Sequence, residues 1–281
     1  MAYDGYECLR VRCQRGVAFV TIDHPPINLF DLALMRDMMR VGEELAADDG
    51  VRVIVFDSAD PEFFIAHADV GLIQQLPPSA PRPTELGFFH AMVDRFRTMP
   101  KATIAKIEGR ARGGGSEFVL SLDMRFGALG RAVLAQPEVA LGIIPGGSGT
   151  QRLGRFAGRA RALEIVLGCD DFDAITAAAY GWINRALPRA ELRPFVDRLA
   201  ARIASYPRDA VRLAKEAVDA SAPSFADGLL AEQAAWNATM TDPALDARFD
   251  AALAAGAQTR DGEKDLDALL TRRPAPGSAE H

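Results

Sequence analysis

The sequence contains few of the features that would place a protein in a membrane or in an oxidising compartment. Its only cysteines, Cys8, Cys13 and Cys169, form no zinc-like cluster and leave one thiol unpaired in any disulfide scheme. No apolar run approaches the roughly 18 residues that a membrane span requires, and the N-terminus has no apolar signal core. We therefore expect a soluble protein of the reducing cytoplasm.

The chain also lacks a net positive charge and has only four histidines. The net charge of −6 does not favour nucleic acid or an anionic membrane as a partner. The histidines show no metal-ligand spacing among themselves or with the cysteines: His24, His67, His90 and His281. The glycine clusters lack both the G-x-G-x-x-G dinucleotide fingerprint and the Gly-Lys-Ser/Thr end of a phosphate-binding loop. We expect no metal ion and no nucleic-acid partner.

The composition does provide a large apolar core. At 281 residues and 49% hydrophobic content, the chain can form one large domain or two unequal ones. Alternating and β-branched runs predict a hairpin and two further strands, a helix begins at the N-cap Asp31, and a proline-rich surface loop follows. The expected elements are the hairpin 8–22, the helix 31–45, the strands 51–56 and 103–108, and the loop 77–83. Strand alternating with helix indicates an α/β layered core.

After about residue 160 the chain becomes rich in alanine, leucine and arginine, which favour helix. Prolines at positions 188, 194, 207, 223 and 243 punctuate this stretch. The expected helices are 159–167, 174–180, 193–204, 210–220 and 225–240. We predict a core with the active site over residues 1–190, a helical C-terminal region over 191–270, and a disordered tail over 271–281.

The most informative stretch runs from Gly113 to Glu117, with a second glutamate, Glu138, following later. The glycines come after a strand-like run and before an apolar helical run, so bare backbone N–H groups can point at a ligand near a helix N-terminus. Such donors, with two carboxylates that can move protons, suit enolate chemistry. The alternatives are a tight turn without a ligand, and glutamates that are solvated or simply favourable at a helix end.

A second glycine cluster covers residues 145–150. It misses the G-x-S-x-G nucleophile elbow because Thr150 stands where the last glycine belongs. We expect a turn ahead of a helix that holds Gln151 and Arg152.

Taken together, these motifs resemble the crotonase (enoyl-CoA hydratase/isomerase) superfamily. The resemblance covers roughly residues 8 to 270 and is more specific than any one glycine run. The stretches that carry it are Pro25 to Asn28, Phe64 to Asp69, Gly113 to Glu117, Gln136 to Glu138, Gly142 to Leu153 and Ala178 to Asn184.

The resemblance implies an α/β fold, a spiral of ββα units with a helical C-terminal region that builds homotrimers, often paired into hexamers. It also implies an acyl-CoA thioester as the substrate, with coenzyme A as part of the substrate and no separate cofactor. The thioester oxygen would lie in an oxyanion hole formed by the backbone N–H groups of Ala68 and Gly114. The neighbouring substrate-binding or CoA-binding positions would be Ala66, His67, Asp69, Arg112, Gly113, Pro145 and Gly146.

Both glutamates of the water-adding members are matched, by Glu117 and Glu138, whereas isomerase members commonly keep only the position of Glu138. By similarity, Glu117 would orient and deprotonate water, and Glu138 would supply the proton to the α-carbon. The sequence therefore predicts reversible hydration of a 2-enoyl-CoA to a 3-hydroxyacyl-CoA. The alternatives are other enolate chemistry (double-bond isomerisation, decarboxylation or C–C cleavage) and a non-catalytic scaffold.

Some residues depart from the family pattern. His67 occupies a position that is often glycine, and it would narrow the acyl channel, touch the CoA arm or pack into its loop. Arg110 and Arg112 stand where relatives carry apolar or aromatic side chains. One interpretation is that these arginines form structural ion pairs, with Asp123 or Asp69. The alternative hypothesis is that Arg112 selects a polar or carboxylated acyl chain.

The chain also has few basic residues at the positions that often hold the CoA phosphates in relatives. Glu62 and Gly71 stand where lysines are frequent in relatives. Arg36, or Arg272 and Arg273 near the C-terminus, would compensate, and an unusual pantetheine thioester is the alternative.

Overall fold

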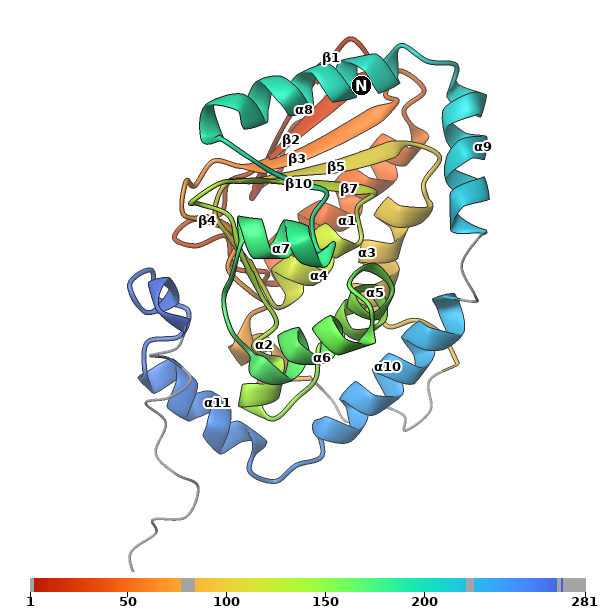
Figure 1. Ribbon diagram of the computed structural model, residues 1–281. Coiled ribbons are helices and arrows are strands. Elements are labelled where there is room, and N and C mark those ends of the chain that lie inside the picture. The colour runs from red at the N-terminus through yellow and green to blue at the C-terminus, as the bar shows by residue number, and fades with distance from the viewer. Residues whose placement is uncertain (1–2, 77–83, 221–224, 267–268, 270–281) are drawn as a thin grey trace, which may run out of the picture.

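Two sheets form the frame of the computed structural model, which describes residues 3–76, 84–220, 225–266 and 269 (Figure 1). The large sheet has the order β1-β2-β3-β5-β7-β10 and the small sheet the order β4-β6-β8-β9. The large sheet contains β1 (Leu9–Gln14), β2 (Val17–Ile22), β3 (Val53–Ser58), β5 (Ala102–Ile107), β7 (Met124–Ala128) and β10 (Arg185–Leu187). The small sheet contains β4 (Phe63–Ile65), β6 (Arg110–Arg112), β8 (Val133–Ala135) and β9 (Phe172–Asp173).

From β3 to β8, consecutive strands alternate between the two sheets. In each of the pairs β3 and β4, β5 and β6, and β7 and β8, the first strand joins the large sheet and the second joins the small sheet. A helix then follows: α2 (Val70–Gln74), α4 (Gly114–Leu120) or the 3₁₀ helix η1 (Glu138–Leu141). The chain thus repeats a ββα unit, and neighbouring units pair in parallel through both sheets. The expected spiral of ββα units is confirmed.

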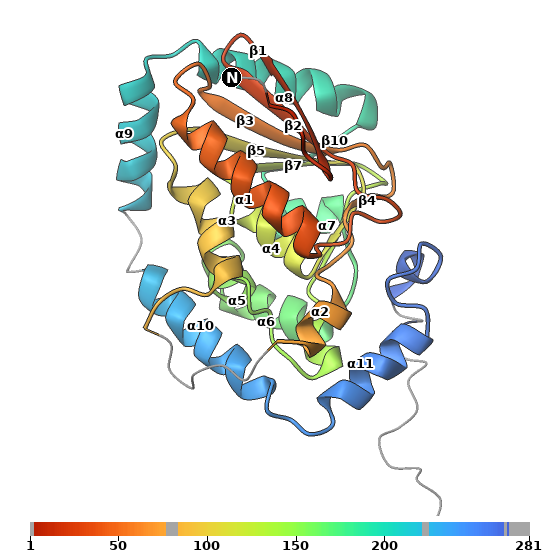
Figure 2. The ribbon, with the colours of Figure 1, turned by 180° about the vertical axis from the view of Figure 1, so that it is seen from behind.

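Both faces of the large sheet are covered, which explains the continuous apolar run in β3. Ile54 and Phe56 pack against α1 (Leu32–Ala47) and α3 (Phe88–Thr98), which Figure 2 shows on one side of the sheet. Val53 and Val55 point to the opposite face and pack against α8 (Arg189–Ala204). Parallel strands buried on both faces characteristically lose the alternation of polar and apolar residues.

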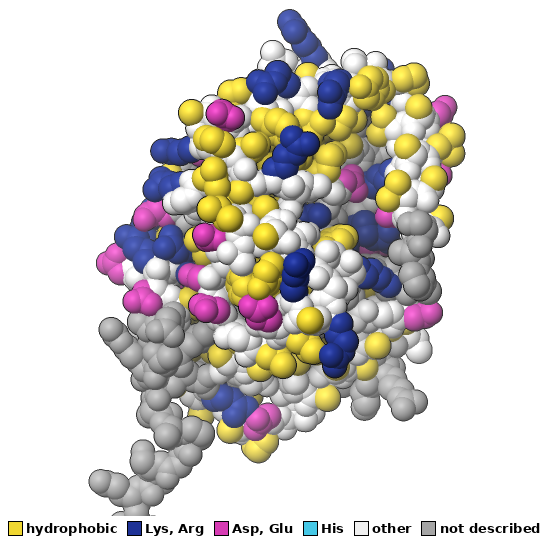
Figure 3. Space-filling model, in the orientation of Figure 1, with side chains coloured by type: hydrophobic (Ala, Val, Ile, Leu, Met, Phe, Trp, Pro, Cys, Tyr) yellow, Lys and Arg dark blue, Asp and Glu magenta, His cyan; other side chains and the backbone are white. Residues whose placement is uncertain are grey.

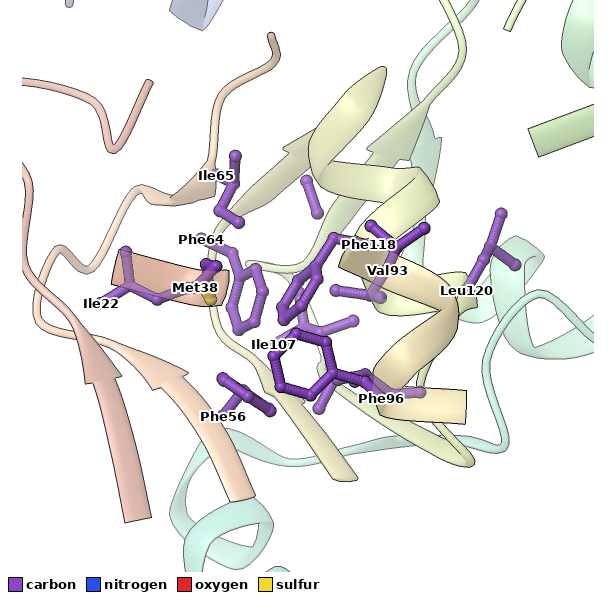
Figure 4. Packing of buried hydrophobic residues seen from close by; sticks show 14 of the residues in the cluster. Ile22, Met38, Phe56, Phe64, Ile65, Val93, Phe96, Ile107, Phe118 and Leu120 are labelled. Atoms are coloured by element: carbon purple, nitrogen blue, oxygen red, sulfur yellow. The ribbon is translucent and has the colours of Figure 1, made fainter. Parts of the chain in front are cut away.

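The core beside α4 is aromatic. Phe118 of α4 meets Phe56 and Phe96 edge to face, with ring centroids 5.1 and 5.5 Å apart (Figure 4). Such pairs add about 0.5–1.5 kcal/mol each beyond the area they bury. Because Phe118 follows Glu117 directly, this packing fixes the helix that carries the glutamate.

The local predictions were largely confirmed. The hairpin is β1 and β2, paired antiparallel around Arg15 and Gly16, and Asp31 caps α1 by accepting a hydrogen bond from the Leu34 N–H. One boundary was wrong, because α8 begins at Arg189 and continues through Pro194. Its buried stripe on the large sheet outweighs the hydrogen bond that proline removes, which ordinarily costs about 3 kcal/mol.

The last helices extend along the outside of the core. They are α5 (Gly149–Phe156), α6 (Arg159–Gly168), α7 (Ala174–Tyr180), α9 (Arg208–Asp219), α10 (Phe225–Thr239), α11 (Leu245–Ala254) and the 3₁₀ helix η2 (Gly262–Lys264). In Figure 1, α9 stands at one edge, while α10 and α11 run below the core. The expected loop 77–83 and tail 271–281 lie outside the described residues, and the division at residue 190 stays a prediction. Within the described part of the chain, every helix is too short or too polar to cross a membrane.

Candidate active site

Three neighbouring strands of the small sheet end at one place. β4, β6 and β8 run parallel, so their carboxyl ends share an edge of the sheet. Ala68, Gly114 and Glu138 each follow one of these strands within a few residues. Ligands of open parallel sheets commonly bind outside the carboxyl ends of the strands.

The turn into α4 requires glycine at position 113. Gly113 has a φ of +48°, a region that side chains rarely adopt, and its N–H donates to the Ala135 carbonyl oxygen at 3.0 Å. A Cβ atom there would lie 3.0 Å from Oε1 of Glu138. The turn therefore brings the start of α4 close to the second carboxylate.

The backbone at Ala68 and Gly114 forms a pair of open donors. The residues on either side of Ala68 bond to Phe30, whose N–H donates to the His67 carbonyl and whose carbonyl accepts from the Asp69 N–H. Among the described residues, the N–H groups of Ala68 and Gly114 have no hydrogen-bond acceptor. A Cβ at Gly114 would lie 3.2 Å from the Ala68 Cβ and 3.5 Å from the Ala68 nitrogen, so a side chain here would crowd the space beside the two donors. Two adjacent N–H groups at a helix N-terminus suit a negatively charged oxygen.

Glu117 lies in the first turn of α4, as the sequence predicts, and is 4% exposed. Its Oε1 accepts the N–H groups of Gly147 and Gly149 at 2.7 and 2.8 Å. Burial and the charge of Glu232 raise the pKa of Glu117 to about 8, although the two N–H groups oppose this shift. The carboxyl group is thus prepared to exchange a proton near neutral pH.

Glu138 begins η1 and is 9% exposed. Burial, followed by the negative charge of Glu117, raises the pKa of Glu138 well above its ordinary value. The amide of Gln136, turned with its nitrogen toward the carboxylate, donates to both oxygens at 3.0 and 3.1 Å and accepts from Ser116 Oγ. Two buried carboxyl groups whose charges repel each other resist being ionised together, so the pair tends to retain at least one proton.

Two cavities meet at these groups. The larger has a volume of about 450 Å³ and the smaller about 70 Å³. Both are lined by Ala68, Ile73, Gly114, Glu138 and Ile143, while Glu117 faces the larger one alone. Apolar side chains of the larger cavity include Met35, Leu72, Phe89 and Trp236. The arrangement suits a mainly apolar ligand with one polar, reacting end.

The smaller cavity has a charged wall. Nε2 of His67 lies 2.8 Å from Oε1 of Glu263, and Nη1 of Arg112 lies 3.4 Å from Oε2 of the same carboxylate. Arg112 is fully buried and also holds Asp171 through Nε at 2.7 Å and Nη2 at 2.5 Å. The prediction that Arg112 pairs with Asp123 or Asp69 was wrong. Its three nitrogens are all engaged by Asp171 and Glu263.

The remaining predicted residues fall into two groups. Asp69 and Gly146 line the larger cavity, and Asp69 also caps α2 by accepting the Gly71 N–H at 2.9 Å. Ala66 and Pro145 line neither cavity; Ala66 packs against Ile27 and Phe63 in the core. The sequence therefore predicted the segments that line the site. It did not distinguish the residues that face a cavity from neighbours that do not, such as Ala66 and Pro145.

Several residues of the site had no local signal. Glu232 and Trp236 come from α10, in a stretch whose composition indicated only a helix, and Glu263 comes from η2. Gly146 shows how closely α10 approaches, because a Cβ there would lie 2.2 Å from Cδ1 of Trp236. Across the described ranges, no group of three or more His, Cys, Asp or Glu side chains could hold a metal ion.

Comparison with known proteins adds independent information. A family model described as enoyl-CoA hydratase/isomerase matches residues 12–246. The chain is 32% identical over 216 residues to the crotonyl-CoA hydratase of Syntrophomonas wolfei, covering 76% of this chain and 82% of the relative. It is 32% identical over 205 residues to the short-chain-enoyl-CoA hydratase of Clostridium acetobutylicum, covering 72% and 77%.

A solved structure is also similar over almost the whole chain. It is a protein from Streptomyces avermitilis, provisionally assigned as an enoyl-CoA hydratase, and it is 46% identical with a TM-score of 0.88. The match covers 95% of this chain and 98% of that chain. Sequence and fold therefore point to the same family.

Proposed function

The chain belongs to the enoyl-CoA hydratase/isomerase family, and we propose that it adds water reversibly to a 2-enoyl-CoA, giving a 3-hydroxyacyl-CoA. The hydratase names of its relatives support this reaction. The observation that carries the proposal is the meeting of two buried carboxyl groups, Glu117 and Glu138, with two open N–H groups at one cavity. Water addition needs a base for the water and an acid for the α-carbon, and two carboxyl groups can divide these tasks.

In the proposed reaction the thioester oxygen accepts hydrogen bonds from the N–H groups of Ala68 and Gly114. Glu117 removes a proton from water as the water oxygen bonds to C3, and the electrons of the double bond move toward the thioester. The enolate-like charge collects on the thioester oxygen, where each rigid donor contributes about 3–4 kcal/mol by analogy with other oxyanion holes. Protonated Glu138 then delivers its proton to C2.

The raised pKa values support this division of labour. One proton on the pair suffices, because Glu138 gives a proton to carbon while Glu117 gains one from water. After hydration Glu117 is protonated and Glu138 is ionised, so the pair still holds one proton, and dehydration runs both proton transfers in reverse. With the pKa of Glu117 raised to about 8 and that of Glu138 raised well above its ordinary value, the reacting state, in which Glu117 is ionised and Glu138 is protonated, forms as pH rises through about 8.

The substrate brings its own coenzyme A, and the proposal includes no further cofactor. Arg36 is exposed near the start of α1, and its Nε donates to the carbonyl of Leu32, which lines the larger cavity; this position supports a role in binding a CoA phosphate. Arg272 and Arg273, the other proposed phosphate ligands, lie outside the described residues. An apolar cavity of about 450 Å³ supports a mainly hydrocarbon acyl group.

We also propose self-association into homotrimers or pairs of trimers. No described side chain of α9 is buried in this single chain. Its apolar residues Leu213 and Val218 are 52% and 71% exposed. Figure 3 shows hydrophobic side chains over α9 and also over α6 and α7, where Leu163, Leu167 and Ile175 are exposed. Exposed apolar side chains that gather on one surface commonly mark a protein interface. The free thiols of Cys8, Cys13 and Cys169 support a cytoplasmic location.

The test is turnover of a panel of 2-enoyl-CoAs, followed by loss of the enoyl thioester absorbance and by identification of the product. We expect a 3-hydroxyacyl-CoA that takes its oxygen from labelled water. Glu117→Gln and Glu138→Gln should each lower kcat by about 100-fold or more, since each removes a proton-transfer group.

Other outcomes would replace the proposal. Acyl-CoA binding without water incorporation, together with double-bond migration, loss of CO₂ or carbon–carbon cleavage, would assign different enolate chemistry. Neither turnover nor binding of any acyl-CoA would indicate a non-catalytic scaffold.

A further inference from the structure

The turn formed by residues 147–151 donates to two carboxylates in alternation. The N–H groups of Gly147 and Gly149 donate to Glu117, while those of Ser148 and Gln151 donate to Glu232 at 2.5 and 3.2 Å. The Thr150 hydroxyl also donates to Glu232. Two carboxylates thus share the N-terminal end of α5, where backbone N–H groups and the helix dipole favour negative charge.

Glu232 is the more enclosed of the two. Its side chain is fully buried, and Nε2 of His90 approaches its Oε1 at 3.2 Å. Backbone N–H groups and a hydroxyl surround the carboxylate, so its negative charge is held by donors on several sides. Ser148, at the centre of the turn, has a φ of +91°, which a residue with a side chain adopts only where its surroundings hold it.

The helix that carries Glu232 has little freedom to shift. A Cβ at Gly228 would lie 2.2 Å from Oε1 of Gln151, and the Gly87 N–H donates to Oε1 of Gln233 at 2.9 Å. α10 is therefore seated closely on the 147–151 turn and on the start of α3. The close packing of α10 therefore fixes the position from which the Glu232 side chain contacts the turn.

We propose that Glu232 is a positioning residue, which holds the 147–151 turn so that its N–H groups orient Glu117 and which places a third negative charge beside the reacting pair. Glu232 does not line either cavity, so it acts through Glu117 and touches no substrate. The expected effect on catalysis rests on the proposed hydration. The effect of Glu232 on the position and ionisation of Glu117 can be measured in the protein without substrate.

The charged groups around Glu117 set the expected effect. Glu232 of α10 opposes ionisation of Glu117, whereas Arg152 of α5 favours it, and His90 of α3 faces Glu232. Burial, followed by the charges of Glu117 and Glu232, raises the pKa of Glu138 of η1. Burial and the charge of Glu232 raise the pKa of Glu117. Removing that charge should lower the pH at which Glu117 ionises, and it should also loosen the turn.

The test compares Glu232→Gln with Asp227→Asn, which removes one charge from an exposed position on the same helix. The carboxyl ¹³C resonance of Glu117, identified by its loss in Glu117→Gln, is titrated in protein without substrate. We expect the midpoint to fall by about one pH unit in Glu232→Gln, the lower end of shifts between close like charges, and to stay in place in Asp227→Asn. The acidic limb of kcat/KM should move down by the same amount, while kcat falls roughly tenfold because Glu117 is less well oriented.

An unchanged Glu117 midpoint in folded Glu232→Gln would overturn the inference, since a purely structural glutamate would lower only stability. Glu232→Asp covers the case in which the glutamine variant does not fold. It keeps the charge but shortens the reach, so kcat should fall with the midpoint close to that of the unaltered protein; a full kcat would contradict the positioning role. A shifted midpoint in a protein that hydrates no enoyl-CoA would retain the role of Glu232 and reject the proposed reaction.

Discussion

His67 and Glu263 lie 196 residues apart in the sequence, yet Nε2 of His67 and Oε1 of Glu263 are 2.8 Å apart. The other ring nitrogen of His67, Nδ1, lies 2.8 Å from the Ala68 carbonyl oxygen. Both nitrogens face oxygens that can only accept, so the ring donates from both as an imidazolium. The pair ties the loop that presents the Ala68 N–H to the C-terminal segment of the chain.

The first prediction concerns the pH at which this pair stabilises the fold. Burial lowers the pKa of His67, but the charge and hydrogen bond of Glu263 outweigh it and raise the pKa above 6.5. Burial raises the pKa of Glu263, but His67 outweighs it and lowers the pKa below 4.5. The histidine contribution is lost as pH rises through the raised pKa, and the glutamate contribution is lost as pH falls through the lowered one.

Glu263→Gln should therefore cost most in stability between about pH 4.5 and 6.5, roughly 3 kcal/mol for breaking a buried pair. Thermal unfolding at about pH 5.5 and pH 9 measures this. Glu191→Gln, at an exposed position of α8, is the control and should have little effect at either pH. Equal losses for Glu263→Gln at both pH values would contradict the assignment.

The second prediction concerns Arg112, which the sequence offered as a selector of carboxylated acyl chains. Its nitrogens are occupied by Asp171 and Glu263, so Arg112→Met should destabilise the fold by about 3–5 kcal/mol, the usual effect of breaking a buried ion pair. The ratio of kcat/KM between plain and carboxylated enoyl-CoAs should stay the same, measured at a temperature where the variant is folded. A selective loss of carboxylated substrates would restore the original hypothesis.

The third prediction is that Glu117 reduces stability at alkaline pH. Its pKa of about 8 lies above the ordinary 4.5, so the protein favours the protonated group and loses stability as pH rises through that range. Glu117→Gln keeps an oxygen for the N–H groups of Gly147 and Gly149 and carries no charge. Its Tm should exceed that of the unaltered protein at about pH 9 and match it near pH 4.5. Glu7→Gln, at an exposed site, should change neither, and a lower Tm for Glu117→Gln at pH 9 would show that the raised pKa is wrong.

The fourth prediction compares two glycines of one region. A Cβ at Gly147 would lie 2.4 Å from Cε1 of Phe89 and 2.5 Å from Oε2 of Glu117, whereas a Cβ at Gly154 meets nothing within 4 Å. Gly147→Ala should lower kcat by about 100-fold, as expected when a reacting group is displaced by about 1 Å. Gly154→Ala, within α5, should retain activity and raise stability by up to about 1 kcal/mol. Equal activities of the two variants would show that the 147–151 turn tolerates displacement.

The fifth prediction concerns assembly through α9. Leu213→Glu places a charge on the exposed apolar face of this helix and should reduce the mass measured by light scattering to that of one chain. Gln14→Glu adds the same charge on the exposed β1 strand and should leave the mass unchanged. Full assembly of the Leu213→Glu protein would exclude α9 from the interface.

The parts of the molecule that the sequence predicted are those with local causes. β-branched runs and the Asp31 cap set strands and a helix within a few residues, and the backbone freedom of Gly113 set the turn into α4. The missed parts depend on long-range contacts. No local pattern indicates that Glu232 will cap α5 or that Glu263 will meet His67, and α8 passes through Pro194 because the sheet beneath it supplies the packing.

The three strand ends of the small sheet have an evolutionary consequence. Ala68, Gly114 with Glu117, and Glu138 each belong to a different ββα unit, so the N–H donors and proton carriers of the proposed reaction are spread over three repeats, with Gly114 and Glu117 on the same one. In the proposed reaction, a substitution of Glu138 can change the proton transfer while the other two units keep the N–H donors of Ala68 and Gly114. The frame therefore allows descendants to exchange one chemical step at a time without first losing the ability to hold the substrate.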